Sequence, residues 1–162
     1  MLEYLKGKEE VTISMVCLGN ICRSPMAAAI LYNRRSEISA PRIIVDSSGT
    51  GAWHVGEGPN PHSKQTWEKH GLKYDHTAKK FSKNDFYVSD LILVMDSSNY
   101  ANVMALANDD VRHKVRYLRE FDTENPNDLD VPDPYSLAIG HFEAVYEMID
   151  RSITGLLREL SR

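Results

Sequence analysis

The sequence predicts one α/β domain with three layers, in which a four-stranded parallel sheet has helices on both faces. Apolar runs rich in β-branched residues alternate along the chain with segments of helical periodicity. The most apolar run, residues 91–95, is bounded by Asp90 and Asp96, as expected of a central strand buried on both faces. Apolar residues recur every three or four positions over residues 137–160, which indicates a helix that packs one side on the sheet.

The first half of the chain predicts two strands and two helices. A first strand covers residues 11–16, and a helix over residues 25–35 follows it, with basic residues at the end that the helix dipole favours. A second strand, residues 42–46, stops at a run of serine and glycine. A long loop, residues 52–61, then leads to a helix at about 62–70, which a glycine closes.

The second half predicts the remaining two strands. After the central strand, Asp96 is placed to cap a helix that continues to about Ala107. Residues 113–118 are typical of a weaker edge strand. Because the carboxyl ends of parallel strands share one edge of the sheet, we expect Cys17, Ser47 and Asp96 to lie in one crevice.

The N-terminus and the two cysteines bear on domain organisation and compartment. Residues 1–10 are mostly charged, so we predict a flexible extension followed by one domain over residues 11–162. The chain shows neither a signal-peptide core nor a run approaching 18 apolar residues. Cys17 and Cys22 form a poor disulfide framework and fit a reducing compartment. We therefore expect a cytoplasmic protein, with export without a cleavable signal left open.

Charge and residue types exclude some function classes. The formal net charge is −4, and Lys and Arg are dispersed, which predicts that neither nucleic acid nor a membrane is a partner. The six histidines show no metal-ligand spacing with carboxylates or thiols, so we predict no metal and no cofactor. We expect a monomer. Any phosphate site must be a local feature of such a chain.

The loop after the first predicted strand carries chemistry suited to an anion. It opens a helix, whose first N–H groups have no partner within the helix and lie at its positive end. Five residues separate Cys17 from Arg23, so a loop curled around one phosphate brings the sulfur below the phosphorus and the guanidinium onto two oxygens. Gly19 and Asn20 tolerate left-handed backbone angles that turn N–H groups inward. The helix end, Arg23 and the Ser24 hydroxyl favour a nucleophilic thiolate.

Each of these features also has a plainer interpretation. Cys17 is alternatively a small buried residue beside a serine that caps a helix. Trp53 either forms one wall of an aromatic pocket or only packs its own glycine-rich loop. Asp133 stands between two prolines, where it is either a proton donor for a leaving group or part of an ordinary Asp-Pro turn, and Asp128 and Asp130 are close by.

The segment Cys-Leu-Gly-Asn-Ile-Cys-Arg-Ser-Pro, residues 17–25, resembles the phosphate-loop motif of the low-molecular-weight protein tyrosine phosphatases. Other segments agree with the family in order and spacing, namely residues 46–50, 53–56, 76–78, 95–96, 133–135 and 142–146. The resemblance covers most of the chain from about Val11 onward. It implies hydrolysis of phosphotyrosine in proteins, and of small aryl phosphates, through a cysteinyl-phosphate intermediate.

The resemblance also implies roles for individual residues. Cys17 matches the nucleophile, Arg23 the phosphate clamp and Asp133 the general acid, which returns as the base. The loop that binds phosphate or other oxyanions would also comprise Leu18, Gly19, Asn20, Ile21, Cys22 and Ser24. Residues that would hold this loop by hydrogen bonds are Asn20, Ser47 and His76. Residues that would line the substrate crevice are Trp53 and Tyr135. Cys22 either forms a disulfide with Cys17 under oxidant or is a small buried side chain.

The sequence departs from the family pattern after Tyr135. The family commonly has a second tyrosine and a glycine there, and this chain has Ser136 and Leu137. The acid is retained, but one aromatic wall is missing, which leaves open the substrate preference and any regulation by tyrosine phosphorylation at this place.

Two other functions compete with a phosphatase. Thiol-dependent arsenate reductases can share such a loop, but their chemistry needs further cysteines, and this chain has none after Cys22. A phosphotyrosine-binding module without turnover would be expected to lack Cys17, Arg23 or Asp133, and all three are present.

Overall fold

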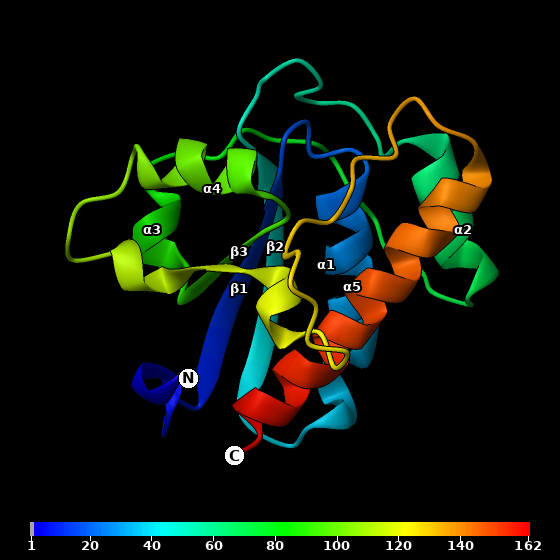
Figure 1. The fold of residues 1–162 in the computed structure, drawn as a ribbon. Helices are drawn as coiled ribbons and strands as arrows, with labels where there is room; N and C mark the ends of the chain where they lie inside the picture. Colours follow the sequence, from blue (N-terminus) through cyan, green and yellow to red (C-terminus); the bar gives the residue numbers. More distant parts are fainter. Residues whose placement is uncertain (1) are drawn as a thin grey trace.

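A computed structural model describes residues 2–162 and confirms the predicted α/β architecture (Figure 1). The four strands are all parallel and lie in the order β2-β1-β3-β4. Their bounds are β1 Glu10–Cys17, β2 Arg42–Gly49, β3 Leu91–Val94 and β4 Val115–Tyr117.

Helices cover both faces of the sheet, which gives the predicted three layers (Figure 1). One face carries α1 (Arg23–Arg34), α2 (Pro61–Lys69) and α5 (Ile139–Leu160). The other carries α3 (Asp85–Val88) and α4 (Ser97–Met104). Residues 2–162 also contain four short 3-10 turns: η1 Glu3–Leu5, η2 Arg35–Glu37, η3 Arg112–Lys114 and η4 Leu118–Phe121.

Alternation along the strands divides the core in two. Ile13, Met15 and Cys17 belong to the large cluster that α1 and α5 cover, whereas Val16 and Val94 belong to the smaller cluster beneath α4. Successive side chains of a strand point to opposite faces, so this split follows from the backbone. Cys17, as the last residue of β1, therefore points toward the layer that contains α1.

The element bounds differ from the sequence expectations where tertiary contacts decide them. β2 runs on to Gly49, three residues beyond the predicted end, because it pairs with β1 as far as Cys17. Helix α1 begins at Arg23 rather than at Pro25. The four-residue helix α3 was not predicted, since it is too short to show a helical period.

The N-terminal residues pack on the domain and do not form the flexible extension that their charge predicted. Leu2 and Leu5 are buried in the main core, and Leu5 is the last residue of η1. The Tyr4 hydroxyl donates to the carbonyl of Asp90 at 2.8 Å, and Lys8 pairs with the same residue's carboxylate at 3.0 Å. The prediction followed the five charged residues of this segment. The packing instead follows the two leucines, because burial of their apolar surface is favourable.

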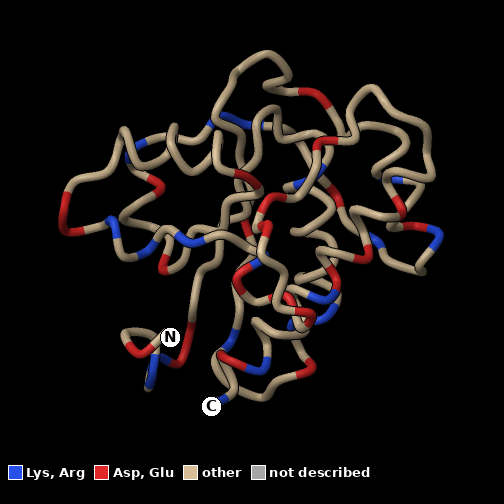
Figure 2. The backbone as a smooth tube through the Cα atoms, in the orientation of Figure 1, with Lys and Arg blue, Asp and Glu red and all other residues tan. Residues whose placement is uncertain are grey.

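The termini lie together at the end of the sheet opposite the carboxyl ends of the strands (Figure 1). Figure 2 shows Lys and Arg distributed over the whole chain among Asp and Glu, without a basic block. Within residues 2–162, no helix has the length and apolar character needed to cross a bilayer.

Candidate active site

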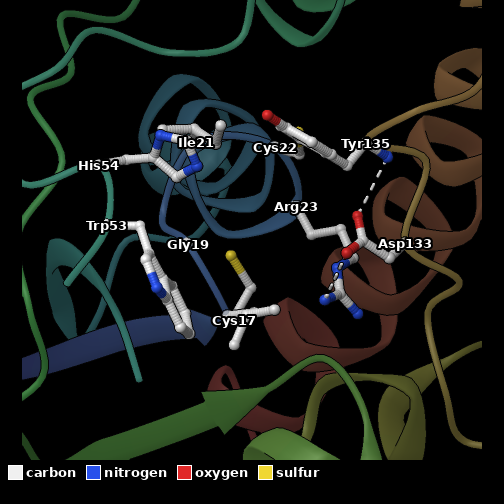
Figure 3. A pocket seen from close by; sticks show the side chains of 10 residues that line it. Cys17, Gly19, Ile21, Cys22, Arg23, Trp53, His54, Asp133 and Tyr135 are labelled. Carbon is white, nitrogen blue, oxygen red and sulfur yellow. Dashed lines mark hydrogen bonds and ion pairs between the residues drawn. The ribbon is translucent and has the colours of Figure 1, made fainter. Parts of the chain in front are cut away.

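A cavity of about 150 Å³ lies where β1 gives way to α1 (Figure 3). Most of the predicted site residues meet there. The lining residues are Cys17, Leu18, Gly19, Ile21, Cys22, Arg23, Trp53, His54, Asp133 and Tyr135. The predicted residues Asn20, Ser24, Ser47 and His76 do not line the cavity, and hydrogen bonds connect the other three to Asn20.

Cys17 lies at the bottom of the cavity with two hydrogen-bond partners on its sulfur. The backbone N–H of Asn20 donates to Sγ at 3.3 Å, and the Ser24 hydroxyl is 3.0 Å from the same atom. Arg23, the first residue of α1, adds a positive charge to the cavity wall. Cys17 thus has polar partners and a cation close to its sulfur, in a position open to the cavity.

The carbonyl groups of the loop between Cys17 and Arg23 accept hydrogen bonds from neighbouring segments of the chain. Backbone N–H groups of the segment after β2 and of the start of α2 donate to them at 2.8–3.0 Å, namely Thr50 to Cys17, Gly51 to Leu18 and Asn60 to Ile21. The Ser63 hydroxyl donates to the carbonyl of Cys22 at 2.8 Å. With the carbonyl groups turned out, the N–H groups of the loop can face the cavity, which is the arrangement of an anion-binding nest.

Asn20 holds the loop from behind. It adopts a left-handed backbone conformation with φ 58°, one of two positive-φ residues other than glycine within residues 2–162. Its side-chain amide donates to Ser24 at 2.8 Å and to Ser47 at 3.1 Å, and its Oδ1 accepts from the backbone of Lys79 at 3.0 Å. His76 Nε2 is 2.6 Å from its carbonyl oxygen. The unusual conformation is thus fixed by contacts on both sides of the side chain and on the backbone.

Gly49 allows the loop to approach the end of β2. A Cβ atom at this position would lie 2.7 Å from the carbonyl oxygen of Leu18 and 3.0 Å from the backbone nitrogen of Asn20. The first distance is shorter than real Cβ atoms show, and the second is tighter than nine in ten real Cβ contacts. The glycine that ends β2 is therefore required by the shape of the loop.

Arg23 is the buried cation of the site, with a side chain only 2% exposed. Its Nη1 donates to Asp96 Oδ2 at 2.6 Å and to the carbonyl of Val131 at 2.9 Å, and its Nη2 is 3.7 Å from Asp133 Oδ2. Burial opposes its charge, but the negative groups at Cys17, Asp96 and Asp133 outweigh burial and raise the pKa of Arg23. The guanidinium is therefore a permanent positive charge in the cavity wall.

Asp133 extends over the cavity from the loop that precedes α5 (Figure 3). The backbone N–H of Tyr135 donates to Oδ1 at 3.1 Å, while Oδ2 faces Arg23. Its side chain is 43% exposed, so water and a leaving group can both reach it. The prolines on either side, residues 132 and 134, limit the backbone angles of this segment.

Aromatic side chains form the mouth of the cavity. Trp53 and Tyr135 stand on different sides of it in Figure 3, and Trp53 is 72% exposed. The indole lies so close to Gly51 that a Cβ there would be 1.8 Å from the ring. His54 extends the wall, with its ring centroid 6.0 Å from that of Tyr135. An aromatic group entering the cavity would pass between these side chains.

Cys22 is chemically distinct from Cys17, although both lie in the same loop as free thiols. Burial, and then the nearby negative groups of Cys17 and Asp133, raise the pKa of Cys22 to about 12. Cys22 is therefore a neutral thiol at physiological pH and a poor nucleophile.

Sequence reasoning placed Asp96 at the crevice but missed its ion pair with Arg23, and it did not single out His54. The position of Asp96 directly after β3 was the available signal, because the carboxyl end of a strand faces the crevice. Residues 2–162 also contain one cluster of potential metal ligands, His70, Glu143 and Glu147, with ligand atoms within 4.8 Å. This cluster joins α2 to α5 and is not part of the cavity.

Comparison with known proteins agrees with this geometry. The profile of the family "Low molecular weight phosphotyrosine protein phosphatase" matches residues 12–162. A low molecular weight protein-tyrosine-phosphatase of Streptomyces coelicolor is 39% identical over 148 residues, which are 90% of this chain and 90% of that protein.

Solved structures show the same fold. YfkJ from Bacillus subtilis superposes with a TM-score of 0.86 at 32% identity, covering 94% of this chain and 96% of that one. The Drosophila arginine phosphatase DARP gives a TM-score of 0.86 at 32% identity, covering 93% of this chain and 98% of that one. Sequence and structure together show that the chain belongs to the low molecular weight phosphotyrosine protein phosphatase family.

Proposed function

We propose that the chain hydrolyses phosphotyrosine in proteins, and small aryl phosphates, through a phosphorylated Cys17. The observation that carries this proposal is the convergence of Cys17, Arg23 and Asp133 on one cavity at the start of α1. A thiolate, a fixed cation and a reachable carboxyl group are the three groups that this reaction needs.

In the first step, the Cys17 sulfur attacks phosphorus as the phosphorus–oxygen bond to the tyrosine breaks. Arg23 and the loop N–H groups bind the oxygens of the transferring phosphoryl group, whose charge they offset. Asp133 in its protonated form gives its proton to the departing phenolate oxygen. The products are tyrosine and a phosphocysteine.

In the second step, a water molecule attacks the phosphocysteine. Asp133, now a carboxylate, takes a proton from this water, and the phosphorus–sulfur bond breaks to restore the Cys17 thiolate and release inorganic phosphate. The exposed face of Asp133 admits the water. Asn20, Ser47 and His76 act indirectly, because they keep the loop N–H groups in position through both steps.

The walls favour an aryl phosphate over phosphoarginine, the substrate class suggested by the name of DARP. Leu18, Trp53 and Tyr135 offer apolar and aromatic surface to a phenyl ring. A phosphoguanidinium group would need negative partners, and Asp133, the one carboxylate among the lining residues, faces Arg23. Both substrate classes belong in the test.

The same arrangement supports two further parts of the proposal. Cys17, Arg23 and Asp133 meet within the fold of a single chain, so the proposal assigns the reaction to a monomer. The mechanism needs Cys17 as a free thiol, which fits a reducing compartment such as the cytoplasm.

The test compares three purified proteins: the wild type, Cys17→Ser and the matched thiol variant Cys22→Ser. Each is assayed with p-nitrophenyl phosphate, phosphotyrosyl peptides and phosphoarginine. We expect the wild type to hydrolyse the two aryl phosphates and the Cys17→Ser protein to be inactive, while Cys22→Ser retains activity. Hydrolysis by Cys17→Ser at the wild-type rate, or a preference for phosphoarginine, would contradict the proposal.

A further inference from the structure

A second hollow, here called the flank hollow, lies beside the catalytic cavity. Its volume is about 300 Å³, and its lining residues are Asn60, Pro61, His62, Tyr135, Ser136 and Leu137. The first three begin α2 and the last three precede α5, two segments that run beside each other in Figure 1. Tyr135 lines both spaces. A ligand seated on the phosphate loop therefore has the flank hollow directly beyond the tyrosine ring.

Hydrogen bonds attach one wall of the flank hollow to the phosphate loop and give the other wall a local turn. The Asn60 N–H donates to the carbonyl of Ile21 at 2.8 Å, and Asn60 Oδ1 caps α2 by accepting from the N–H of His62 at 2.9 Å. On the other wall, the N–H of Leu137 donates to the carbonyl of Pro134 at 2.9 Å. Because the hollow is already formed, a side chain that enters it does not have to order the wall first.

The hollow combines apolar or aromatic surface from Pro61, Tyr135 and Leu137 with the polar residues Asn60, His62 and Ser136. None of its six lining residues is Lys, Arg, Asp or Glu. Leu137 is 43% exposed, and Ile139, the first residue of α5, is 47% exposed. Leu137 is also one of the two residues that replace the aromatic and glycine positions common in the family. A branched apolar side chain therefore forms part of the hollow that shares Tyr135 with the catalytic cavity.

We infer that the flank hollow binds an apolar side chain, of the size of leucine, isoleucine or phenylalanine, within about three residues of the phosphotyrosine in a protein substrate. This inference rests on the proposed function. A phosphotyrosine with its phosphate at Cys17 leaves the cavity past Tyr135, so the adjacent main chain passes over this ring. Consecutive Cα atoms are about 3.8 Å apart, which brings a neighbouring side chain into reach of the hollow.

A second copy of the chain is the other occupant that such a surface admits. Continuity with the catalytic cavity through Tyr135 favours the substrate, because any bound phosphoprotein must cover the surface around the mouth. Measuring the oligomeric state of the same variants separates the two occupants.

The experiment measures kcat/KM for a set of phosphotyrosyl peptides that differ at one flanking position at a time, with Leu, Ala, Glu or Lys there. The enzymes are the wild type, Leu137→Glu and Leu137→Ala. The matched control is Leu106→Glu, because Leu106 has a similar exposure of 39% and follows α4 on the other face of the sheet. Hydrolysis of p-nitrophenyl phosphate, which has no flanking residues, reports the catalytic cavity alone.

We expect the wild type to prefer the best leucine peptide over its glutamate counterpart by about tenfold, a typical gain for one apolar group in a pocket. Leu137→Glu should remove this preference by raising KM for the leucine peptide. Leu106→Glu should keep the preference. All variants should hydrolyse p-nitrophenyl phosphate at similar rates. If Leu137→Glu also slows hydrolysis of p-nitrophenyl phosphate, its effect is not specific to the hollow. Leu137→Ala, a smaller change, then tests whether the preference for the leucine peptide decreases while hydrolysis of p-nitrophenyl phosphate is unchanged.

A preference that stays intact in both Leu137 variants would overturn the inference, as would equal rates for all flanking residues in the wild type. A wild-type dimer that Leu137→Glu dissociates, with peptide selectivity unchanged, would assign the hollow to a second copy. A wild type that does not hydrolyse p-nitrophenyl phosphate at all would instead refute the proposed function.

Discussion

Arg23 and Asp96 form a partly buried ion pair that links the candidate site to the opposite face of the sheet, with Nη1 2.6 Å from Oδ2. The other carboxylate oxygen of Asp96 accepts from the backbone N–H of Asn99 at 2.8 Å and so caps α4. The carboxylate is therefore held by the helix end at the same time as it holds the guanidinium. Two elements on different faces of the sheet thus position one cation.

We predict that Asp96→Asn weakens phosphate binding. The amide keeps the shape but loses the charge that holds Arg23, which is then drawn toward Asp133, 3.7 Å away. The inhibition constant of inorganic phosphate should rise about tenfold, since hydrogen bonds between charged groups contribute about 1.5–3 kcal/mol. The control is Asp109→Asn, whose side chain is fully exposed. An unchanged inhibition constant in Asp96→Asn would show that Arg23 does not depend on this partner.

Asp133→Ala should slow hydrolysis according to the leaving group. A poor leaving group such as phenol or tyrosine needs the proton, so its turnover should fall by about 10² to 10⁴, the usual contribution of a general acid. For p-nitrophenol, whose anion is already stable, phosphorylation of the enzyme should fall much less. Single-turnover rates for a series of substituted phenyl phosphates measure this difference, and an equal loss for all of them would argue against proton donation by Asp133.

Gly49→Ala should damage the phosphate loop from outside the cavity. The added methyl group would meet Leu18 and Asn20 backbone atoms at 2.7 and 3.0 Å, so the loop must shift. We expect kcat/KM to fall by about 10- to 100-fold, as overpacking costs about 1–3 kcal/mol. Gly58→Ala is the matched control, because no atom lies within 4 Å of a Cβ there. Similar kinetics for both alanine variants would show that the close approach at Gly49 is dispensable.

Stability should depend on pH through His76. Burial lowers the pKa of His76 below its ordinary value of about 6.5, although its hydrogen bond to Asn20 works in the opposite direction. The folded protein then binds fewer protons at His76 than the unfolded chain does. The contribution of His76 to the free energy of unfolding is therefore fully present above pH about 6.5, and it is lost as the pH decreases through the folded pKa.

Urea denaturation at a series of pH values measures this effect. The loss of stability on acidification should be smaller in His76→Gln, since the glutamine amide can replace Nε2 as the donor but does not titrate. The difference between the two proteins isolates His76 from the other histidines. An identical pH dependence would mean that His76 takes up its proton equally in the folded and unfolded states.

Much of the fold was predictable because strands and helices alternate with clear periods. The five apolar residues from Leu91 to Met95 and the stripe on α5 each indicate their element without help from the rest of the chain. The packing of Leu2 and Leu5 was not predictable, because two leucines in a charged segment give no period and their burial depends on distant residues.

The site was predictable where the chemistry lies in one segment. Cys17, Gly19, Asn20 and Arg23 are close in sequence, so a local motif describes them. Asp96 is 73 residues from Arg23, and its ion pair arises only once β1 and β3 are neighbours in the sheet. Contacts between residues far apart in the sequence depend on the order of the strands in the sheet, and a local sequence motif does not contain this information.

The most direct test of the account is to identify the residue that carries the phosphoryl group. Asp133→Ala is mixed with p-nitrophenyl phosphate, quenched in acid after a short time and examined by mass spectrometry. Asp133 also activates the water of the second step, so the intermediate should accumulate. We predict one phosphoryl group on Cys17, with none on Cys22 and none in a Cys17→Ser, Asp133→Ala protein. A phosphoryl group on another residue, or turnover with no phosphorylated protein at any time, would contradict the account.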